Sequence, residues 1–314
     1  MNFTGTLKQA ILEALAYSDI FDYPLQLKEL HRYLPVRAEL EELPDTLESL
    51  HGQVGVKDGY YFLPGREEMV EIRKRREACS QKLLPMALNY GRMIGALPFV
   101  RMVVLTGSLA VRNPSGNVDF DYLIVAAPGR VWMARAFTLL FNRIVKLFGH
   151  TLCPNLIISE NVLEWHLHDL YTARELCQMI PIMGMDVYQK LMQANGWARD
   201  FLPNAILESA DLPSTLQKQA SVLQGFLEFP LSGKLGDRFE QWEMTRKIAR
   251  FSKQDGFGEE TVFTADLCQG NFDHHRKWTR EAFEGKLSAL AAVPGGELVV
   301  TQSSPGTAIG AGRL

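Results

Sequence analysis

Two short groups of residues have types and spacings that suit phosphate chemistry. Gly107 and Ser108 follow the apolar run 103–105 after Thr106, and after ten further residues Asp119 and Asp121 open a second apolar run. Strand side chains alternate between the two faces of a sheet, so aspartates at positions i and i+2 place both carboxylates on one face. The sequence therefore predicts two convergent carboxylates close to a glycine–serine turn.

The Gly-Ser turn has the properties of a phosphate-binding site. Gly107 lets a phosphate approach the backbone, and Ser108 offers a hydroxyl at a predicted helix start whose first amides point outward. Arg112 follows within a few residues and is a further candidate phosphate contact. We expect Gly107, Ser108 and Arg112 to bind a nucleoside triphosphate.

The aspartate pair predicts a metal site. Two carboxylates side by side raise each other's pKa unless a cation lies between them. Hard oxygen ligands favour Mg²⁺, with Mn²⁺ as a substitute, in a site completed by phosphate oxygens. Such a metal could activate an acceptor hydroxyl and stabilise the leaving pyrophosphate, so Asp119 and Asp121 are expected to be metal ligands and catalytic residues.

The elements around these residues form an α/β core in which strands alternate with helices. Three apolar runs, 103–105, 119–125 and 155–158, indicate strands. The amphipathic stretch 131–148 indicates a helix that ends at Gly149. We predict an α+β chain divided into an N-terminal domain (1–65), a linker helix (66–97), the core (98–160), a helical C-terminal domain (161–292) and a disordered tail (293–314).

The N-terminal domain has the element order of a winged helix-turn-helix. Three helical stretches precede a hairpin whose turn is Asp58-Gly59. The segment 1–65 carries five Lys or Arg against ten Asp or Glu, and its third helix, 39–50, is strongly acidic. Because phosphates would be repelled, DNA binding is disfavoured and a docking or dimerising role is preferred.

The whole pattern resembles the signature of the DNA polymerase beta nucleotidyltransferase superfamily, in which Gly-Ser is followed by Asp-x-Asp inside an apolar strand. More narrowly, the chain resembles bacterial nucleotidyltransferase-domain proteins that carry a winged-helix-like N-terminal segment. The resemblance spans residues 5–290 and includes the stretches 18–24, 60–63, 169–175, 178–181 and 201–204. It implies a polymerase beta-type core and transfer of a nucleoside monophosphate from a nucleoside triphosphate to a hydroxyl.

The sequence departs from that signature on the next predicted strand. Members of the superfamily usually place a third acidic residue there, whereas this chain has Asn155, which cannot act as a general base. Some members, such as CCA-adding enzymes, work with two carboxylates. Two interpretations stay open: an enzyme whose acceptor is RNA, a protein or a small molecule, and a catalytically weak or inactive nucleotide-binding protein with a regulatory role.

Composition narrows the class of protein. The net charge of −3 gives no overall attraction to nucleic acid, and the four scattered cysteines form no CxxC pair, which argues against a zinc site. No apolar run reaches the roughly 18 to 20 residues of a membrane span and no leader is evident, so a cytoplasmic protein is expected. The basic cluster 73–76 is interpreted as a solvated face or a nucleic-acid contact, and His274 and His275 as surface or helix-capping residues.

Overall fold

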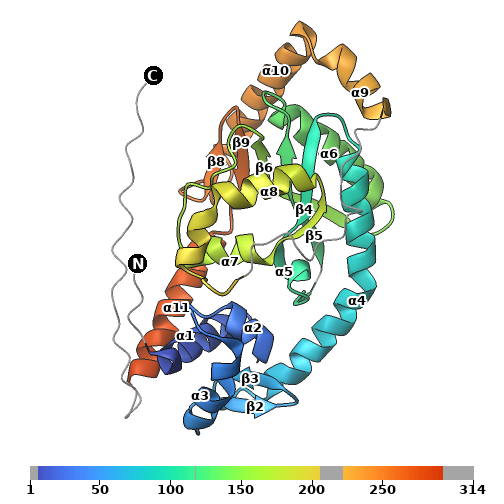
Figure 1. Cartoon of the computed structure of the whole chain (residues 1–314). Coiled ribbons are helices and arrows are strands. Elements are labelled where there is room, and N and C mark those ends of the chain that lie inside the picture. Colours follow the sequence, from blue (N-terminus) through green and yellow to red (C-terminus); the bar gives the residue numbers. More distant parts are fainter. Residues whose placement is uncertain (1–5, 117, 206–221, 293–314) are drawn as a thin grey trace.

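The structure, a computed structural model, describes residues 6–116, 118–205 and 222–292. Within these ranges the chain is an α+β fold with eleven α-helices, a six-stranded mixed sheet and a small antiparallel sheet (Figure 1). No helix of the described residues is long and apolar enough to span a membrane. The predicted tail, 293–314, lies outside the described residues.

The N-terminal part has three helices and the three-stranded sheet, in the predicted order. The helices are α1 (Leu7–Asp19), α2 (Leu27–Arg32) and α3 (Leu43–Ser49), and the strands, in sheet order, are β1 (Leu25–Gln26), β3 (Tyr60–Phe62) and β2 (Gly55–Lys57). Asp58 and Gly59 both have positive φ and join β2 to β3 in the hairpin that the sequence predicted. Below the core in Figure 1, this part is joined to it by the long helix α4 (Glu68–Gly95).

The large sheet has the strand order β7-β4-β5-β6-β9-β8. Its strands are β4 (Val100–Leu105), β5 (Asp119–Ala126), β6 (Thr151–Ser159), β7 (Ile180–Met183), β8 (Thr261–Phe263) and β9 (Leu267–Gly270). The β5–β6 pair is parallel and is connected by α6 (Val131–Lys146), whereas all other neighbouring strands are antiparallel. The three strands and the helix predicted for the core are therefore confirmed.

The prediction of an all-helical segment 161–292 is wrong. This segment contributes β7 to one edge of the large sheet and β8 and β9 to the other, so it completes the core instead of forming a separate helical domain. Its helices are α7 (Leu170–Gln178), α8 (Met185–Ala194), α9 (Val222–Glu228), α10 (Lys234–Phe251) and α11 (His275–Ala291). The three strands have only three or four residues each, too few for a period-2 pattern to stand out from helical neighbours.

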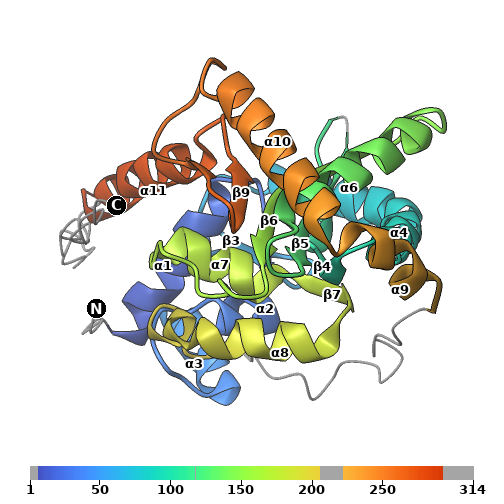
Figure 2. The same cartoon turned by 90° about the horizontal axis from the view of Figure 1, so that it is seen from above.

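Helices cover both faces of the large sheet (Figure 2). Strand residues such as Val103 and Tyr122 pack in one core with α4, α6 and α10, while Val104 and Leu123 pack in the other with α7 and α8. That second core continues without a break into α1, α2 and α3. The N-terminal part is thus packed firmly against the α7–α8 face of the sheet.

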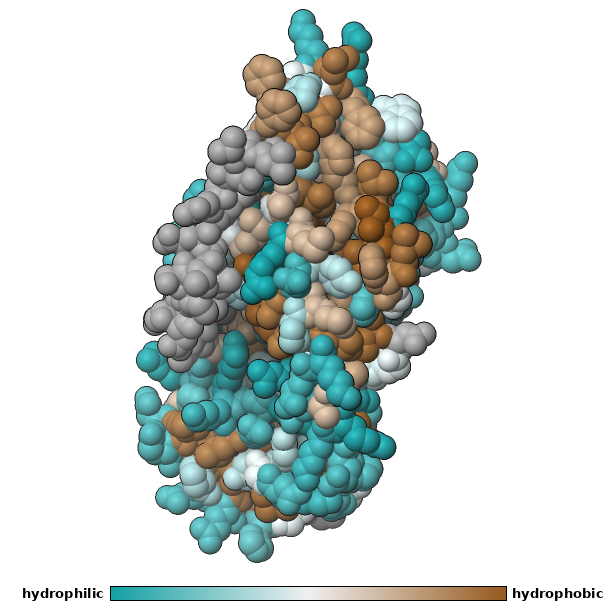
Figure 3. All heavy atoms as spheres, turned by 90° about the vertical axis from the view of Figure 1, so that its right-hand side faces the viewer, coloured by the Kyte–Doolittle hydropathy of each residue, from teal (hydrophilic) through white to brown (hydrophobic). Residues whose placement is uncertain are grey.

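Apolar side chains are exposed mainly on the side of the molecule formed by α6 and α9. Figure 3 shows this side, with a largely hydrophobic upper part and a hydrophilic lower part that belongs to the N-terminal region. The exposed apolar residues here include Leu140, Ile144, Leu147, Phe148, Phe226 and Phe229. They lie on the outside of the helix layer, away from the predicted site.

Candidate functional site

Asp119 and Asp121 open β5, as predicted, and share one face of it. Asp119 is exposed and Asp121 is partly buried. The even-numbered strand residues, such as Tyr122, point into the α4–α6 core. The odd-numbered Leu123 packs on the α7–α8 side. Because strand side chains alternate, both carboxylates face the α7 side of the sheet.

The glycine–serine turn lies directly against this pair. Gly107 has φ +67°, and a Cβ atom built on it would lie 2.3 Å from Oδ2 of Asp121, so only glycine fits here. The Thr106 amide donates to the Asp121 carbonyl at 2.9 Å, which fixes the end of β4 beside β5. The helix expected after the turn, α5 (Gly107–Ala110), is a single turn. It therefore offers little helix dipole, and any phosphate contact depends on Ser108 and the turn itself.

Asn155 lies at a bulge in β6. Tyr122 pairs with Pro154 and Leu123 pairs with Leu156, so Asn155 is an extra residue with no partner in β5. Pro154 has no amide to donate to the ladder, which suits it to this irregular position. The Asn155 side chain forms a hydrogen bond with Asp121, and the Cys153 thiol donates to Asn155 Oδ1 at 2.8 Å. An amide thus lies beside Asp121 on β6.

Burial and a neighbouring negative charge both favour the protonated form of Asp121. Burial raises the pKa of Asp121 to about 6, the hydrogen bond from Asn155 opposes the rise, and the negative charge of Asp119 adds to it. Burial also raises the pKa of the Cys153 thiol to about 12, and the negative charges of Asp121 and Asp119 add to the rise. A cation beside the two aspartates would relieve their repulsion.

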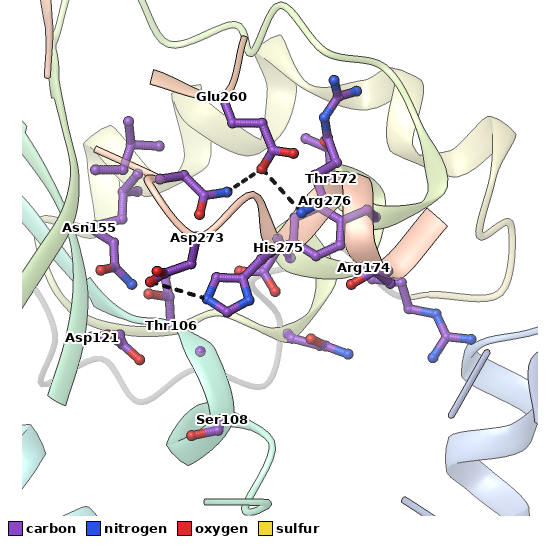
Figure 4. A pocket seen from close by; sticks show the side chains of 18 of the residues that line it. Thr106, Ser108, Asp121, Asn155, Thr172, Arg174, Glu260, Asp273, His275 and Arg276 are labelled. Carbon is purple, nitrogen blue, oxygen red and sulfur yellow. Dashed lines mark hydrogen bonds and ion pairs between the residues drawn. The ribbon is translucent and has the colours of Figure 1, made fainter. Parts of the chain in front are cut away.

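A cavity of about 950 Å³ opens over these residues. Its walls come from the end of β4 and the starts of β5 and β6, from the α1–β1 loop of the N-terminal part, from α7, and from the segment 259–279. Figure 4 shows Ser108, Asp121 and Asn155 together with Asp273 and His275 among the residues that line it. The predicted site residues thus lie in a space large enough for a nucleotide and a small second ligand.

The N-terminal part is tied to the wall of this cavity. Arg76 of α4 donates to the Phe21 carbonyl at 2.9 Å and to Asn113 Oδ1 at 3.1 Å. Asn113 also donates to the Phe21 carbonyl, and its own amide donates to the Ser108 carbonyl at 2.8 Å. The α1–β1 loop is therefore coupled through two side chains to the residue that follows Gly107.

Two groups from distant parts of the sequence enter the cavity without having been predicted. The first is Glu175 of α7, which is partly buried and lines the cavity. Burial raises its pKa to about 7, and the charge of Asp121 adds to the rise. A lone glutamate in a helix carries no recognisable signal in the sequence, although it falls in one of the stretches, 169–175, that carry the family resemblance.

The second group is Asp273 with His275, whose Oδ2 and Nε2 atoms lie 3.9 Å apart. Of the two roles expected for these histidines, surface or helix-capping, the surface role is confirmed for His275, which is exposed, while His274 occupies the N-cap position of α11 without a capping hydrogen bond. Glu260 instead accepts from the Arg276 and Lys277 amides at 3.1 and 2.8 Å. This capping fixes the start of α11 and so holds His275 at the cavity (Figure 4).

Other predicted contacts lie elsewhere. Arg112 is exposed, has φ +58° and does not line the cavity. The interpretation of the basic cluster 73–76 as a solvated face holds for Lys74 and Arg75, which are exposed, but not for Arg73, which is 3% exposed and binds Glu29 and Glu77. Of this cluster only Arg76 reaches the cavity.

The donor set at β5 fits a hard divalent cation. Among the residues that the structure describes, no three His, Cys, Asp or Glu side chains are grouped to enclose a metal. Two carboxylates on one strand suit an ion such as Mg²⁺, which commonly takes one or two protein carboxylates and completes its shell with phosphate oxygens and water. Asp119 and Asp121 would hold such an ion.

Comparisons of the chain with protein-family models, with curated proteins and with solved structures gave no match. The arrangement itself combines two convergent carboxylates, a glycine turn in contact with one of them, and a roomy cavity lined by arginine and histidine side chains. Such a site is suited to binding a metal-complexed phosphate ester.

Proposed function

We propose that this protein is a metal-dependent nucleotidyltransferase, which transfers a nucleoside monophosphate from a nucleoside triphosphate to a hydroxyl. The observation that carries the proposal is the contact between Gly107 and the Asp121 carboxylate. It brings a turn open to phosphate within reach of the carboxylate pair, the juxtaposition that phosphoryl chemistry with Mg²⁺ requires.

The residues have separate roles in this proposal. Asp119 and Asp121 hold Mg²⁺ or Mn²⁺, which when bound neutralises developing charge and lowers the pKa of the acceptor hydroxyl. Ser108 and the turn at Gly107 position the triphosphate, and Arg76 supplies a cation on the cavity wall. Residues of α7 and α11 form further walls of the cavity.

The finer fold assignments belong to the same proposal. The order of β4, α5, β5, α6 and β6, with β5 and β6 parallel, supports a polymerase beta-type core in a bacterial nucleotidyltransferase-domain protein. Three helices followed by the β2–β3 hairpin support a winged-helix-like N-terminal domain. Because this domain is acidic and is packed against the α7–α8 face, we assign it to shaping the cavity and not to binding DNA.

Asn155 favours a second candidate function. With an amide on β6, the protein could bind a nucleotide and metal without efficient transfer and act as a regulatory nucleotide-binding protein. In that case the N-terminal domain, coupled to the turn through Asn113 and Arg76, would report nucleotide occupancy to a partner.

To test this proposal, purified protein is incubated with each α-³²P-labelled nucleoside triphosphate and Mg²⁺ or Mn²⁺. Separate RNA, protein and small-molecule fractions of a cell extract are added as acceptors, and transfer of the label to each fraction is measured. The double variant Asp119→Ala/Asp121→Ala is compared with Glu41→Ala/Asp45→Ala, which removes the same charge from exposed residues of the N-terminal domain. We expect the wild type and the control to label one fraction and the site variant to lose at least about 1,000-fold in rate. Metal-dependent binding without any transfer would favour the regulatory function.

A further inference from the structure

Glu175 is a partly buried carboxylate that lines the cavity. Its helix, α7, packs against α5 beside the Gly107 turn and against α11. Among the residues that the structure describes, none forms an ion pair or hydrogen bond with the Glu175 carboxylate, although Asp121 is close enough for its charge to act on it. Burying a carboxylate without a partner is unfavourable, so its position calls for a function.

The other acidic residues of the cavity are either engaged or exposed. Glu260 caps α11, and Asp22 pairs with Arg66 at 2.6 Å. Asp273 lies beside His275, while Glu164 and Glu259 are exposed to solvent. Among the described carboxylates that line the cavity, and leaving aside Asp119 and Asp121, Glu175 is therefore the partly buried one that remains available to a substrate.

β6 leaves a chemical role unfilled. Attack by a hydroxyl is aided by a group that takes its proton, and the Asn155 amide on β6 cannot do so. Asp119 and Asp121 face α7 across the cavity, so an acceptor approaching the metal site from that side meets Glu175. The carboxylate missing from β6 is thus matched by one on α7.

We propose that Glu175 is the general base of the transfer reaction. As a bond forms between the acceptor oxygen and the α-phosphorus, Glu175 takes the hydroxyl proton and later releases it to water. The bond from the α-phosphorus to the bridging oxygen breaks, and pyrophosphate leaves with that electron pair. This inference rests on the proposed function and adds a catalytic residue to it.

The surroundings of Glu175 suit this role. Burial, with a contribution from Asp121 on β5, raises the pKa of Glu175 to about 7, near the pH at which a general base works best. Tyr17 of α1 and Tyr171 of α7 also face it, and burial raises the pKa of both hydroxyls, so they remain neutral. No lysine or arginine charge acts on the carboxylate among the described residues.

The test compares the wild type with Glu175→Gln, Glu175→Asp and Glu281→Gln. Gln has nearly the shape of Glu but cannot take the proton, Asp retains the carboxylate on a shorter side chain, and Glu281 is an exposed α11 glutamate outside the cavity. Binding of α,β-methylene ATP with Mn²⁺ is measured by calorimetry. Single-turnover transfer is measured with the acceptor fraction that the wild type labels.

We expect Glu175→Gln to bind the analogue within about twofold of wild type and to transfer about 100-fold or more slowly, with Glu175→Asp in between and Glu281→Gln unchanged. Transfer by Glu175→Gln at the wild-type rate would overturn the base role and leave the proposed function intact. Loss of analogue binding in both Glu175 variants would overturn it by showing a structural role. A wild type that transfers to no fraction would overturn both proposals.

Discussion

Two regions of the molecule, the junction of α4 with the N-terminal part and the candidate site, differ in whether their charged side chains are paired. Where α4 meets the N-terminal part, Arg73 binds Glu29 through two nitrogens at 2.7 and 2.8 Å and Glu77 at 2.8 Å, and its guanidinium stacks over the Tyr23 ring. At the site, Asp119, Asp121 and Glu175 have like charges, and none of them forms an ion pair with a lysine, arginine or histidine of the described residues. Paired charges hold a structure together, whereas unpaired like charges indicate a place prepared for a ligand.

The largest effect on stability is expected in the region with paired charges. Arg73→Ala leaves Glu29 and Glu77 partly buried without their cation, which should lower the free energy of unfolding by about 3–5 kcal/mol. Urea unfolding of this variant is compared with that of Arg75→Ala, whose side chain is exposed two residues away. Equal stability of the two variants would contradict the assignment of Arg73 as the buried anchor of the N-terminal part.

A smaller effect on stability is expected from Gly107→Ala, which disrupts the contact between the turn and Asp121. A left-handed φ costs a non-glycine residue about 1–2 kcal/mol, and the new methyl group also displaces the Asp121 carboxylate. We expect a loss of about 2 kcal/mol in unfolding free energy and a much larger fractional loss of Mn²⁺–nucleotide binding, measured by calorimetry. Gly116→Ala is the control, because it has the same φ sign with open space around it.

The sequence correctly predicts those helices, strands and turns that are determined by residues close together in the chain. The alternation of residues 119–125, the amphipathic stretch 131–148 and the Asp58-Gly59 turn depend on local geometry, and all three became the expected elements. The strand β7 contains Pro181 and only four residues, so its place at the sheet edge depends on pairing with β4, some 80 residues earlier. Local patterns cannot show such pairings.

The same limit applies to the site. Asp119 and Asp121 could be predicted because their spacing alone puts them on one face, whereas Glu175 and His275 reach the cavity only through the packing of α7 and α11. For the same reason, the sequence did not show that Arg73 of the cluster 73–76 is buried. The partners of Arg73 and Lys74, which are Glu29 and Asp58, come from other elements and neutralise them.

The smallest effect concerns pH and distinguishes an unpaired carboxylate from a paired one. The pKa of Glu175 is raised from 4.5 to about 7 in the folded protein, so between these values the folded state holds a proton that the unfolded state has released. The contribution of Glu175 to stability therefore falls as pH rises from about 4.5 to 7, and the full penalty is present above 7. In metal-free buffer, Glu175→Gln should be more stable than wild type by about 1–2 kcal/mol at pH 8 and nearly equal to it at pH 5. Urea unfolding at both pH values, with Glu281→Gln as control, tests this prediction. A Glu175→Gln variant that is destabilised equally at both pH values would mean that the carboxylate has a partner. The candidate site and the Arg73 cluster would then not differ in charge pairing.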